Sequence, residues 1–281
     1  MPELPEVETV RKGLQQLVSG KRIQRVTIHW HNIVATQLPI VDWCDLLSGQ
    51  IIQTVSRRGK YLIFQLNDWH LVSHLRMEGK FHYYQEGAHL RPTPKHVHAI
   101  FTFADGSQLH YEDVRKFGRF ELLPQGQLDT FFAQKKLGPE PTWETFKLEP
   151  FIEQLQVIKK PIKPALLEQK LVVGLGNIYV DETLFRTRVH PQTPANCLTY
   201  EAMVHLHQHI IEVLQEAVEA GGSTIRTYLN SLGEAGSFQT TLAVYGRTGE
   251  PCVQCQTPIA KMKLAGRGTH YCPVCQEDRH V

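Results

Sequence analysis

The chain has 281 residues, which is enough for a large hydrophobic core and for two domains. Hydrophobic residues make up 42% of it, and no apolar run approaches the ~18 residues of a membrane span, so we expect no membrane partner. The formal net charge is only +2, so composition alone does not indicate a nucleic-acid partner. The N-terminus is acidic, unlike a secretory signal, and we expect a cytoplasmic protein.

The N-terminal stretch MPELPEVETVRKGLQQLV predicts an amphipathic helix that ends near Gly20. Its apolar face consists of Val7, Val10, Leu14, Leu17 and Val18. Proline is favoured at the first helical position, and carboxylates in the first turn offset the positive helix end, which accounts for Pro5 and Glu6. Pro2 and Glu3 precede the helix, so these reasons leave them unexplained.

Residues 22–123 follow a pattern that has mostly period two. Asn67-Asp68 and Asp105-Gly106 lie between such runs as turns. The pattern predicts antiparallel hairpins in a sandwich or a barrel, with the N-terminal helix packed across them.

The segment Leu137–Pro141 contains a glycine and two prolines and is the expected linker. After it the pattern becomes helical. A helix is predicted to start after Thr199 and to end at Gly221, since its apolar residues share one face. Lys163–Phe185 predicts two helices that are broken by GLGN at residues 174–177.

The GLGN break has two interpretations. It can be a tight packing turn, because the motif alone is weak. It also suits phosphate binding, since glycines allow close approach, the next helix offers N–H groups, and Asn177 adds an amide donor.

Four of the six cysteines lie near the C-terminus with the spacing C-x2-C-x16-C-x2-C. They are Cys252, Cys255, Cys272 and Cys275. Two such knuckles can hold a tetrahedral zinc ion around a β-hairpin, and paired disulfides are not expected in a cytoplasmic chain. We therefore predict one structural Zn²⁺ with no open coordination position and no organic cofactor. Cys44 and Cys197 stand alone and are expected to be buried thiols.

Basic residues gather in four clusters, which raises the odds of a polyanionic partner. The clusters are Arg57-Arg58 with Lys60, Arg115-Lys116 with Arg119, Lys135-Lys136, and Lys159-Lys160 with Lys163. Arg267 lies between two glycines near the expected hairpin tip, where it can contact a phosphate or be a solvated turn charge.

Several segments together resemble formamidopyrimidine-DNA glycosylase, in collinear order from Pro2 to Cys275. They are PELPEVET, RRGKYL at 57–62, HLRMEGK at 74–80, DVRKFG at 113–118, KPALLEQKLVVGLGNIYVDE at 163–182, GGSTIRTY at 221–228 and the two CxxC pairs. The N-terminal motif, GLGNIYVDE and the four-cysteine finger form a very specific combination.

The resemblance implies a multidomain α+β fold. We expect a β-sandwich catalytic domain with a leading helix at 1–136, a linker at 137–150, a helix-two-turn-helix DNA-binding domain at 151–240 and a zinc finger at 241–281. It implies a monomeric base-excision repair enzyme that acts on damaged double-stranded DNA, associated with the nucleoid. The enzyme removes 8-oxoguanine and formamidopyrimidines through a proline Schiff base and cleaves the strand by β,δ-elimination.

The implied nucleophile is Pro2, once Met1 is removed. An α-amino group has a pKa of about 7.7–8.0, so much more of it is neutral near pH 7.5 than of a lysine. A secondary amine that attacks C1′ gives an iminium, the electron sink for elimination. Glu3 is then the adjacent proton donor. Glu6 can orient water or the amine, or can act only on the helix end.

The resemblance also assigns Lys60 a catalytic role near the damaged base and its phosphate, with phosphate binding alone as the alternative. Arg267 and Asn177 are expected to clamp the flanking phosphates, and Arg267 also to assist the last elimination. The further expected DNA contacts are His74, His96, Lys159, Lys163 and Tyr179. A loop over the everted base is expected at Ser223, Ile225, Arg226, Thr227 and Tyr228.

Everting a base leaves a hole in the duplex that side chains must fill. The matching residues are Met77 as an apolar plug, Phe117 as a stacking wedge and Arg115 as a partner for the orphaned cytosine. Without the resemblance, Met77 and Phe117 would be assigned to the core. Lys116 lies where many relatives carry arginine, which puts a bidentate contact there in doubt.

Two alternatives remain open from the sequence. One is an endonuclease VIII-like glycosylase for oxidised pyrimidines, and the other is a non-catalytic zinc-ribbon DNA binder. The relative activity on 8-oxoguanine and formamidopyrimidines and the preference for the opposite base do not follow from the residues.

Overall fold

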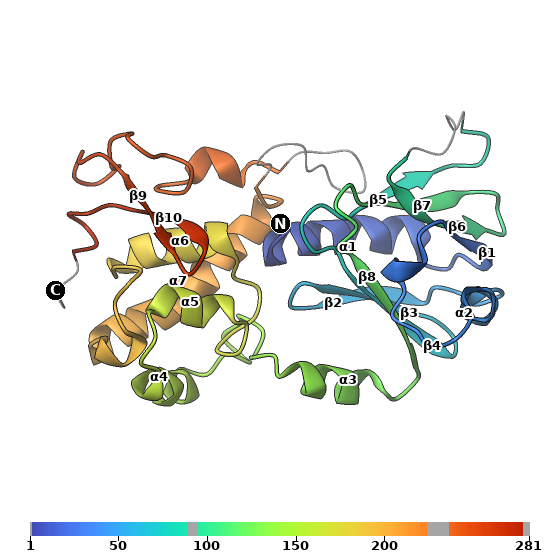
Figure 1. Cartoon of the computed structure of the whole chain (residues 1–281), viewed down its shortest axis with the longest axis horizontal. Coiled ribbons are helices and arrows are strands. Elements are labelled where there is room, and N and C mark those ends of the chain that lie inside the picture. Colours follow the sequence, from blue (N-terminus) through green and yellow to red (C-terminus); the bar gives the residue numbers. More distant parts are fainter. Residues whose placement is uncertain (1, 89–94, 224–235, 278–281) are drawn as a thin grey trace. The chain divides into compact units, whose positions relative to one another are not determined.

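The computed structural model describes residues 2–88, 95–223 and 236–277, and it divides into two compact units (Figure 1). The first, the sheet unit, comprises Met1–Pro2, Glu6–Lys135 and Gly221–Gly236. The second, the helical unit, comprises Glu3–Pro5, Lys136–Ala220 and Ser237–Val281. Helix α1 (Leu4–Val18) begins after Pro2 and Glu3, as the sequence predicted, and its first two residues belong to the helical unit.

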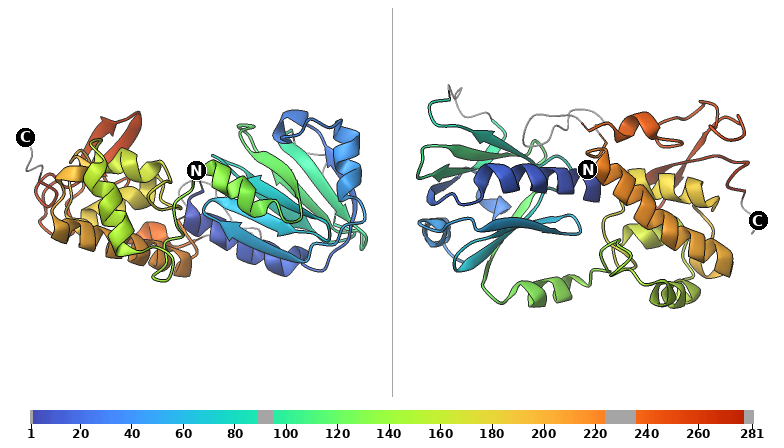
Figure 2. Two further views of the ribbon diagram at one scale, coloured as in Figure 1. Left: turned by 90° about the horizontal axis from the view of Figure 1, so that it is seen from below. Right: turned by 180° about the vertical axis from the view of Figure 1, so that it is seen from behind.

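The sheet unit is a sandwich of two four-stranded antiparallel sheets, with strand orders β1-β6-β7-β5 and β2-β3-β4-β8. The strands are β1 (Ile23–Ile28), β2 (Thr54–Arg58), β3 (Tyr61–Gln65), β4 (Trp69–His74), β5 (Lys80–Tyr84), β6 (Val97–Phe103), β7 (Gln108–Glu112) and β8 (Arg119–Pro124). Aromatic rings from both sheets meet in the core, where Phe81 contacts Phe64 at 5.7 Å and Phe120 at 6.2 Å between centroids. The apolar face of α1 packs into this core, and Figure 2 shows the helix alongside the strands.

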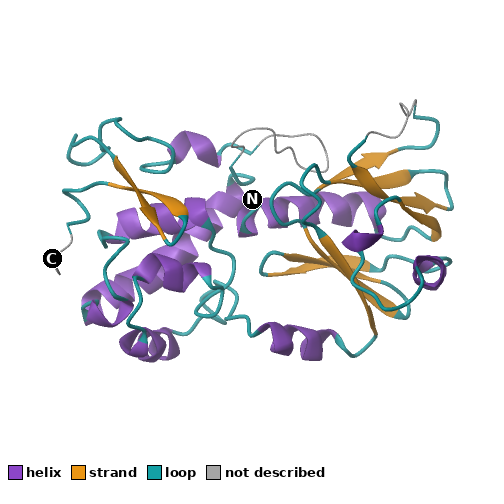
Figure 3. Ribbon diagram, viewed as in Figure 1, coloured by secondary structure: helices purple, strands orange, loops and turns teal. Residues whose placement is uncertain are grey.

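Three helical segments of this unit were not predicted by the period-two pattern, and Figure 3 separates them from the strands. They are η1 (His31–Ile33), α2 (Ile40–Leu47) and α3 (Leu128–Lys135). Cys44 on α2 is half-buried. The expectation of a buried thiol is wrong for Cys197, which is exposed.

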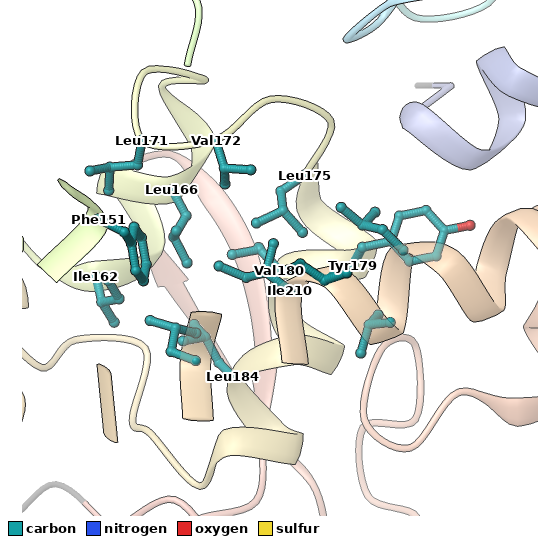
Figure 4. Packing of buried hydrophobic residues seen from close by; sticks show 14 of the residues in the cluster. Phe151, Ile162, Leu166, Leu171, Val172, Leu175, Tyr179, Val180, Leu184 and Ile210 are labelled. Atoms are coloured by element: carbon teal, nitrogen blue, oxygen red, sulfur yellow. The ribbon is translucent and has the colours of Figure 1, made fainter. Parts of the chain in front are cut away.

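The helical unit packs its helices around one apolar cluster (Figure 4). Its elements are α4 (Leu148–Val157), α5 (Ile162–Leu167), α6 (Asn177–Thr187), η2 (Ala195–Cys197), α7 (Tyr200–Glu219), η3 (Phe238–Thr241), β9 (Ala260–Leu264) and β10 (Arg267–Tyr271). Helix α7 begins after Thr199, whose side chain accepts a hydrogen bond from Ala202 N, so its predicted start is confirmed.

The break between α5 and α6 is longer than predicted, because α5 ends at Leu167 rather than near Gly174. Gln169 adopts a left-handed conformation at φ 63°. Its side-chain amide accepts from Gly174 N at 2.9 Å and donates to Leu175 O at 2.7 Å. These side-chain bonds compete with helical ones and hold residues 169–175 in an irregular turn. Within the described residues no helix is both long and apolar enough to cross a membrane.

Candidate functional site

The four C-terminal cysteines form a compact cluster at the base of the β9–β10 hairpin. Their Sγ atoms all lie within 4.8 Å of one another. Backbone N–H groups donate to sulfur, from Gln254 to Cys252 and from Cys275 to Cys272, each at 3.4 Å. Four sulfur ligands in a small volume fit a tetrahedral Zn²⁺ that is closed to substrate.

The hairpin turns at Ala265-Gly266, both in the left-handed region with φ of 47° and 77°. Arg267 follows as the first residue of β10, opposite Leu264, and it is exposed. The hairpin therefore holds one cation at its tip, as the sequence predicted from the two glycines.

A buried ion pair fixes this hairpin against α6. Lys163 Nζ lies 2.7 Å from Asp181 Oδ1, and both side chains are completely buried. Lys163 also donates to Gly268 O at 3.3 Å, and Asp181 Oδ2 accepts from His270 N at 2.9 Å. Burial lowers the pKa of Lys163, and the Asp181 carboxylate opposes that change. The ammonium of Lys163 is therefore paired with Asp181, and the contact of Lys163 with DNA stays a prediction.

A second buried carboxylate, Glu182, holds the segment that leads into the zinc finger. It accepts from three successive N–H groups, those of Ala243, Val244 and Tyr245, at 2.8 to 3.0 Å. Burial is the largest influence and raises the pKa of Glu182, while the three N–H groups oppose the shift. Asp181 and Glu182 had not been singled out in the sequence. Two adjacent acids within an apolar helix pattern were the available signal.

Glu3 lies at the N-terminus of α6. Its carboxylate accepts from Gly176 N at 2.7 Å, Ile178 N at 2.9 Å and Tyr179 N at 3.3 Å, and the residue is 2% exposed. A Cβ at Gly176 would overlap this carboxylate, so the position requires glycine. These N–H groups had been expected to bind phosphate, but Glu3 occupies them.

The other residues predicted around the glycine break are placed differently. The Asn177 amide donates to Gly268 O at 2.9 Å, which adds to the hold on the hairpin. Tyr179 is completely buried with its ring 5.4 Å from Phe238, so its side chain belongs to the core, and a contact of this residue with DNA stays a prediction. Lys159, in contrast, is exposed.

Glu6 has a different partner in the sheet unit. Its Oε1 accepts from Ser223 N at 2.7 Å and from Ser223 Oγ at 3.2 Å. A Cβ at Gly222, where φ is 80°, would lie 2.7 Å from the same oxygen. Glu6 therefore anchors the start of the predicted lesion loop, whose residues 225–228 lie outside the described residues.

Lys60 lies in the two-residue turn between β2 and β3 and is only 7% exposed. The preceding Gly59 has φ 56°. Arg57 donates to Gly59 O at 2.9 Å and to Glu8 at 3.1 Å, so neighbouring charges hold the turn. Pro2 belongs to the same unit and is also buried.

His74 lies at the end of β4. Its Nδ1 accepts from Arg76 N at 2.9 Å. Burial, followed by the charges of Arg76 and Lys60, lowers the pKa of His74 to about 3. The ring is therefore neutral at pH 7 and offers a phosphate a hydrogen bond rather than a charge. His96 is half-buried, and its carbonyl accepts from Asp113 N at 3.0 Å.

Two of the predicted wedge residues, Arg115 and Phe117, lie in a loop that is organised by Asp113. This carboxylate accepts from the N–H groups of Arg115, Phe117 and Gly118 at 2.8 to 3.0 Å. Phe117 is 48% exposed, and the Arg115 guanidinium lies 4.8 Å from its ring. A large aromatic side chain held in solvent by an ordered loop is poised to bind a partner. Asp113 is a positioning residue that the sequence reasoning missed.

The loop that carries Met77 contacts the same part of the sheet unit. Met77 is half-buried. A Cβ added to Gly79 or to Gly118 would overlap the Tyr111 hydroxyl, so both loops need glycine to approach this one side chain. Tyr111 therefore brings together the loops of Met77 and Phe117.

Three family descriptions match the chain in order: the formamidopyrimidine-DNA glycosylase N-terminal domain over residues 1–120, its H2TH domain over 137–229, and the zinc finger found in FPG and IleRS over 249–277. A formamidopyrimidine-DNA glycosylase of Enterococcus faecalis is 55% identical over 278 residues, which span 99% of this chain and 98% of the relative. The chain belongs to the formamidopyrimidine-DNA glycosylase family. The resemblance seen in the motifs is confirmed.

Other members of the formamidopyrimidine-DNA glycosylase family are similar over their full length. The enzyme of Streptococcus pneumoniae serotype 4 is 53% identical over 98% of this chain and 99% of its own. A mutant Lactococcus lactis FPG, solved with Fapy-dG-containing DNA, has a TM-score of 0.93 and 48% identity, and the match covers 99% of this chain and 100% of that one. The Lactococcus lactis Fpg solved with abasic-site DNA has a TM-score of 0.92 and 47% identity, over 98% and 100%. The zinc-finger match and the cysteine cluster together identify one structural zinc site in this member of the family.

Proposed function

We propose that this protein is a DNA base-excision repair enzyme that removes oxidised purines from duplex DNA and then cleaves the strand at the abasic site. The observation that carries the proposal is the full-length match to a glycosylase solved with Fapy-dG-containing DNA, with a TM-score of 0.93 at 48% identity. The protein acts in the cytoplasm, on chromosomal DNA. Zinc serves the fold, because its four cysteine ligands leave no position for substrate.

Base removal begins with the Pro2 nitrogen, unblocked after removal of Met1. The neutral amine attacks C1′ of the damaged nucleotide, the bond to the base breaks, and the base leaves as an anion that takes its proton from water. Glu3 is the neighbouring residue, and three N–H groups at the α6 N-terminus hold its carboxylate. Such donors stabilise the negative form, so Glu3 first takes the proton from the attacking amine and then gives it to the sugar-ring oxygen.

Protonation of the ring oxygen breaks its bond to C1′ and leaves an iminium between Pro2 and the opened sugar. The iminium accepts the electron pair released when a proton leaves C2′, and the 3′ phosphate departs by β-elimination. A second elimination removes the 5′ phosphate, and water then releases Pro2. Lys60 supplies positive charge near the base and its phosphate, and Arg267 binds the departing phosphate from the hairpin tip.

Recognition of the lesion uses the sheet-unit loops. Phe117 stacks in the space left by the everted base, Met77 fills it, and Arg115 bonds the orphaned cytosine. The Arg115–Phe117 contact at 4.8 Å keeps these two side chains in one arrangement before DNA binds. Glu6 anchors the loop start at Ser223. Asn177, Lys159, His74 and His96 contribute to phosphate binding.

The test is borohydride trapping on an 8-oxoguanine·C duplex, with the N-terminus of the protein verified by mass spectrometry. Borohydride reduces the iminium and leaves a covalent protein–DNA adduct. We expect an adduct from the parent and from the control Pro5→Ala, which alters only the first turn of α1. We expect a strongly reduced yield from Pro2→Gly, with DNA binding retained.

Three outcomes would contradict the proposal or its mechanism. A parent protein with a verified free Pro2 and bound zinc that gives no adduct is not this enzyme. A parent that cuts thymine glycol faster than 8-oxoguanine is a pyrimidine-specific relative. An unchanged adduct from Pro2→Gly would remove Pro2 from the mechanism.

A further inference from the structure

Helix α7 carries three histidines in the segment HLHQH at 205–209, and they divide between two faces. His207 points into the helical unit, where it is buried and its Nε2 donates to Phe146 O at 2.7 Å. His205 is exposed and His209 half-buried. These two lie four residues apart and therefore share the outer face of the helix.

The His205 and His209 rings are already close and nearly parallel. Their centroids are 6.1 Å apart and their planes meet at 30°. A transition-metal ion takes imidazole nitrogen at about 2.0–2.1 Å, so two rings that chelate one ion place their nitrogens roughly 3 Å apart. His205 is exposed, so its side chain can rotate towards that geometry.

The neighbouring helix α6 fixes the tautomer of His209. The Thr187 hydroxyl donates to Thr183 O at 2.8 Å, so its oxygen is left to accept from His209 Nδ1 at 3.1 Å. A ring that donates from Nδ1 carries its free lone pair on Nε2, which is then the nitrogen available to a ligand. Metal-binding histidines in proteins commonly have such a partner on the other nitrogen.

The surrounding charges favour a cation. Glu212 lies one turn beyond His209, and its Oε1 accepts a hydrogen bond from Gln208 Nε2 at 2.6 Å. Arg186 is the nearby positive group, and both its terminal nitrogens bond the Glu216 carboxylate at 2.7 Å. That ion pair compensates the arginine charge, so the local balance beside the two rings is negative.

We propose that His205 and His209 form a second metal site, separate from the cysteine cluster, that binds one borderline transition-metal ion such as Zn²⁺, Ni²⁺ or Cu²⁺. The two imidazoles are the protein ligands and water completes the coordination. Two neutral nitrogen donors suit these ions and not Mg²⁺ or Ca²⁺, which prefer oxygen. Because the site exists only on the folded helix, the bound ion stabilises the helical unit in proportion to its occupancy.

The experiment titrates the full-length, zinc-saturated protein with Ni²⁺ by isothermal calorimetry, in a buffer that does not chelate metals. Released zinc is measured in parallel. We expect one Ni²⁺ per chain with the finger zinc retained. His205→Ala and His209→Gln should each weaken Ni²⁺ binding at least ~10-fold, because each variant keeps only one of the two imidazole ligands. Thr187→Val, which keeps both ligands but removes the acceptor for Nδ1, should weaken it by about 3- to 10-fold. His31→Ala, at an exposed histidine of the sheet unit, is the matched control and should bind as the parent does.

Nuclear magnetic resonance distinguishes this site from general surface binding. Paramagnetic Ni²⁺ should broaden the ring signals of His205 and His209 together at substoichiometric metal, before those of any other histidine. The proposal is overturned if Ni²⁺ uptake equals zinc release, or if the double variant His205→Ala/His209→Gln binds Ni²⁺ as the parent does. Unchanged affinity in Thr187→Val would overturn the assignment of the His209 tautomer.

Discussion

The buried pair Lys163–Asp181 allows one sharp prediction, on the variant Asp181→Asn. The substitution keeps the shape of the side chain and removes its charge, so the Lys163 ammonium is left in a site where both side chains are completely buried. Breaking a buried ion pair by removing one partner typically costs about 3–5 kcal/mol of stability. In addition, Asp181 accepts from Lys163 and from His270 N with different oxygens, and asparagine replaces one of these oxygens by an NH2 group, which cannot accept. We expect a loss in this range, which is a roughly 100- to 5,000-fold change in the folding equilibrium.

The assay is urea unfolding of the full-length, zinc-loaded protein at fixed free zinc. Zinc release into a chromogenic chelator reports on the helical unit, which contains the finger. With a slope of about 2 kcal/mol per molar urea, the midpoint should fall by roughly 1.5–2.5 M. The matched control in the same unit is Glu216→Gln, which removes a partly exposed contact to Arg186 at 2.7 Å and should change stability by less than about 1 kcal/mol.

The pH dependence separates charge from shape. Burial lowers the pKa of Lys163 in the folded protein, so the unfolded chain binds more protons and stability rises with pH towards the ordinary lysine value. Without Asp181 the pKa of Lys163 falls further, so the deficit of Asp181→Asn should shrink from pH 7 to pH 9.5. The double variant Lys163→Met/Asp181→Leu should recover much of the loss. A deficit no larger than that of Glu216→Gln, or one independent of pH, would refute this reasoning.

The remaining predictions concern the other groups of the site. Cys272→Ser should release zinc and lower DNA affinity, measured by metal analysis and fluorescence anisotropy; a zinc-free variant with full affinity would contradict this. The pKa of His74 falls from its ordinary 6.5 to about 3 on folding, so acid favours the unfolded chain. Lowering the pH from 8 to 5 should therefore cost the parent about 1–2 kcal/mol more stability than His74→Asn, and equal pH profiles would exclude this cause. Gly176→Ala should displace Glu3, so the single-turnover rate of base release should fall by a larger factor than the affinity for DNA. An unchanged rate of base release would show that the position of Glu3 does not matter. DNA affinity should fall with salt by roughly 0.9 log units per log unit of salt for each neutralised phosphate, and a salt-insensitive affinity would argue against phosphate contacts.

The features that the sequence predicted are those encoded by local chemistry. Thr199 caps a helix because of its own hydroxyl, and the cysteine spacing alone indicates a zinc site. The motifs identified the family, which local patterns could not have done. The N-terminal helix began where the apolar period began, which correctly left Pro2 and Glu3 outside it.

What the sequence could not show are partners that lie far apart along the chain. Glu3 bonds Gly176 and Asp181 bonds Lys163 and His270, and no local pattern pairs these residues. The N–H groups after the GLGN break hold a carboxylate and Lys163 is paired with Asp181, and neither contact follows from the local sequence pattern. Helix α5 already ends at Leu167 because the Gln169 side chain bonds the backbone of Gly174 and Leu175. The helix propensity of glutamine does not predict these bonds.

The attachment of Glu3 to α6 has a practical consequence for anyone who prepares this protein. Leu4 N donates to Gly174 O at 3.1 Å beside the carboxylate bonds of Glu3, so the two residues that follow Pro2 are both held. The Pro2 Cα lies about 3.8 Å from the Glu3 Cα, and the reactive nitrogen is only one bond further, so it stays close to that anchor. Under the proposed mechanism, no purification handle or leftover cleavage residue can be tolerated ahead of Pro2, and affinity tags belong after Val281.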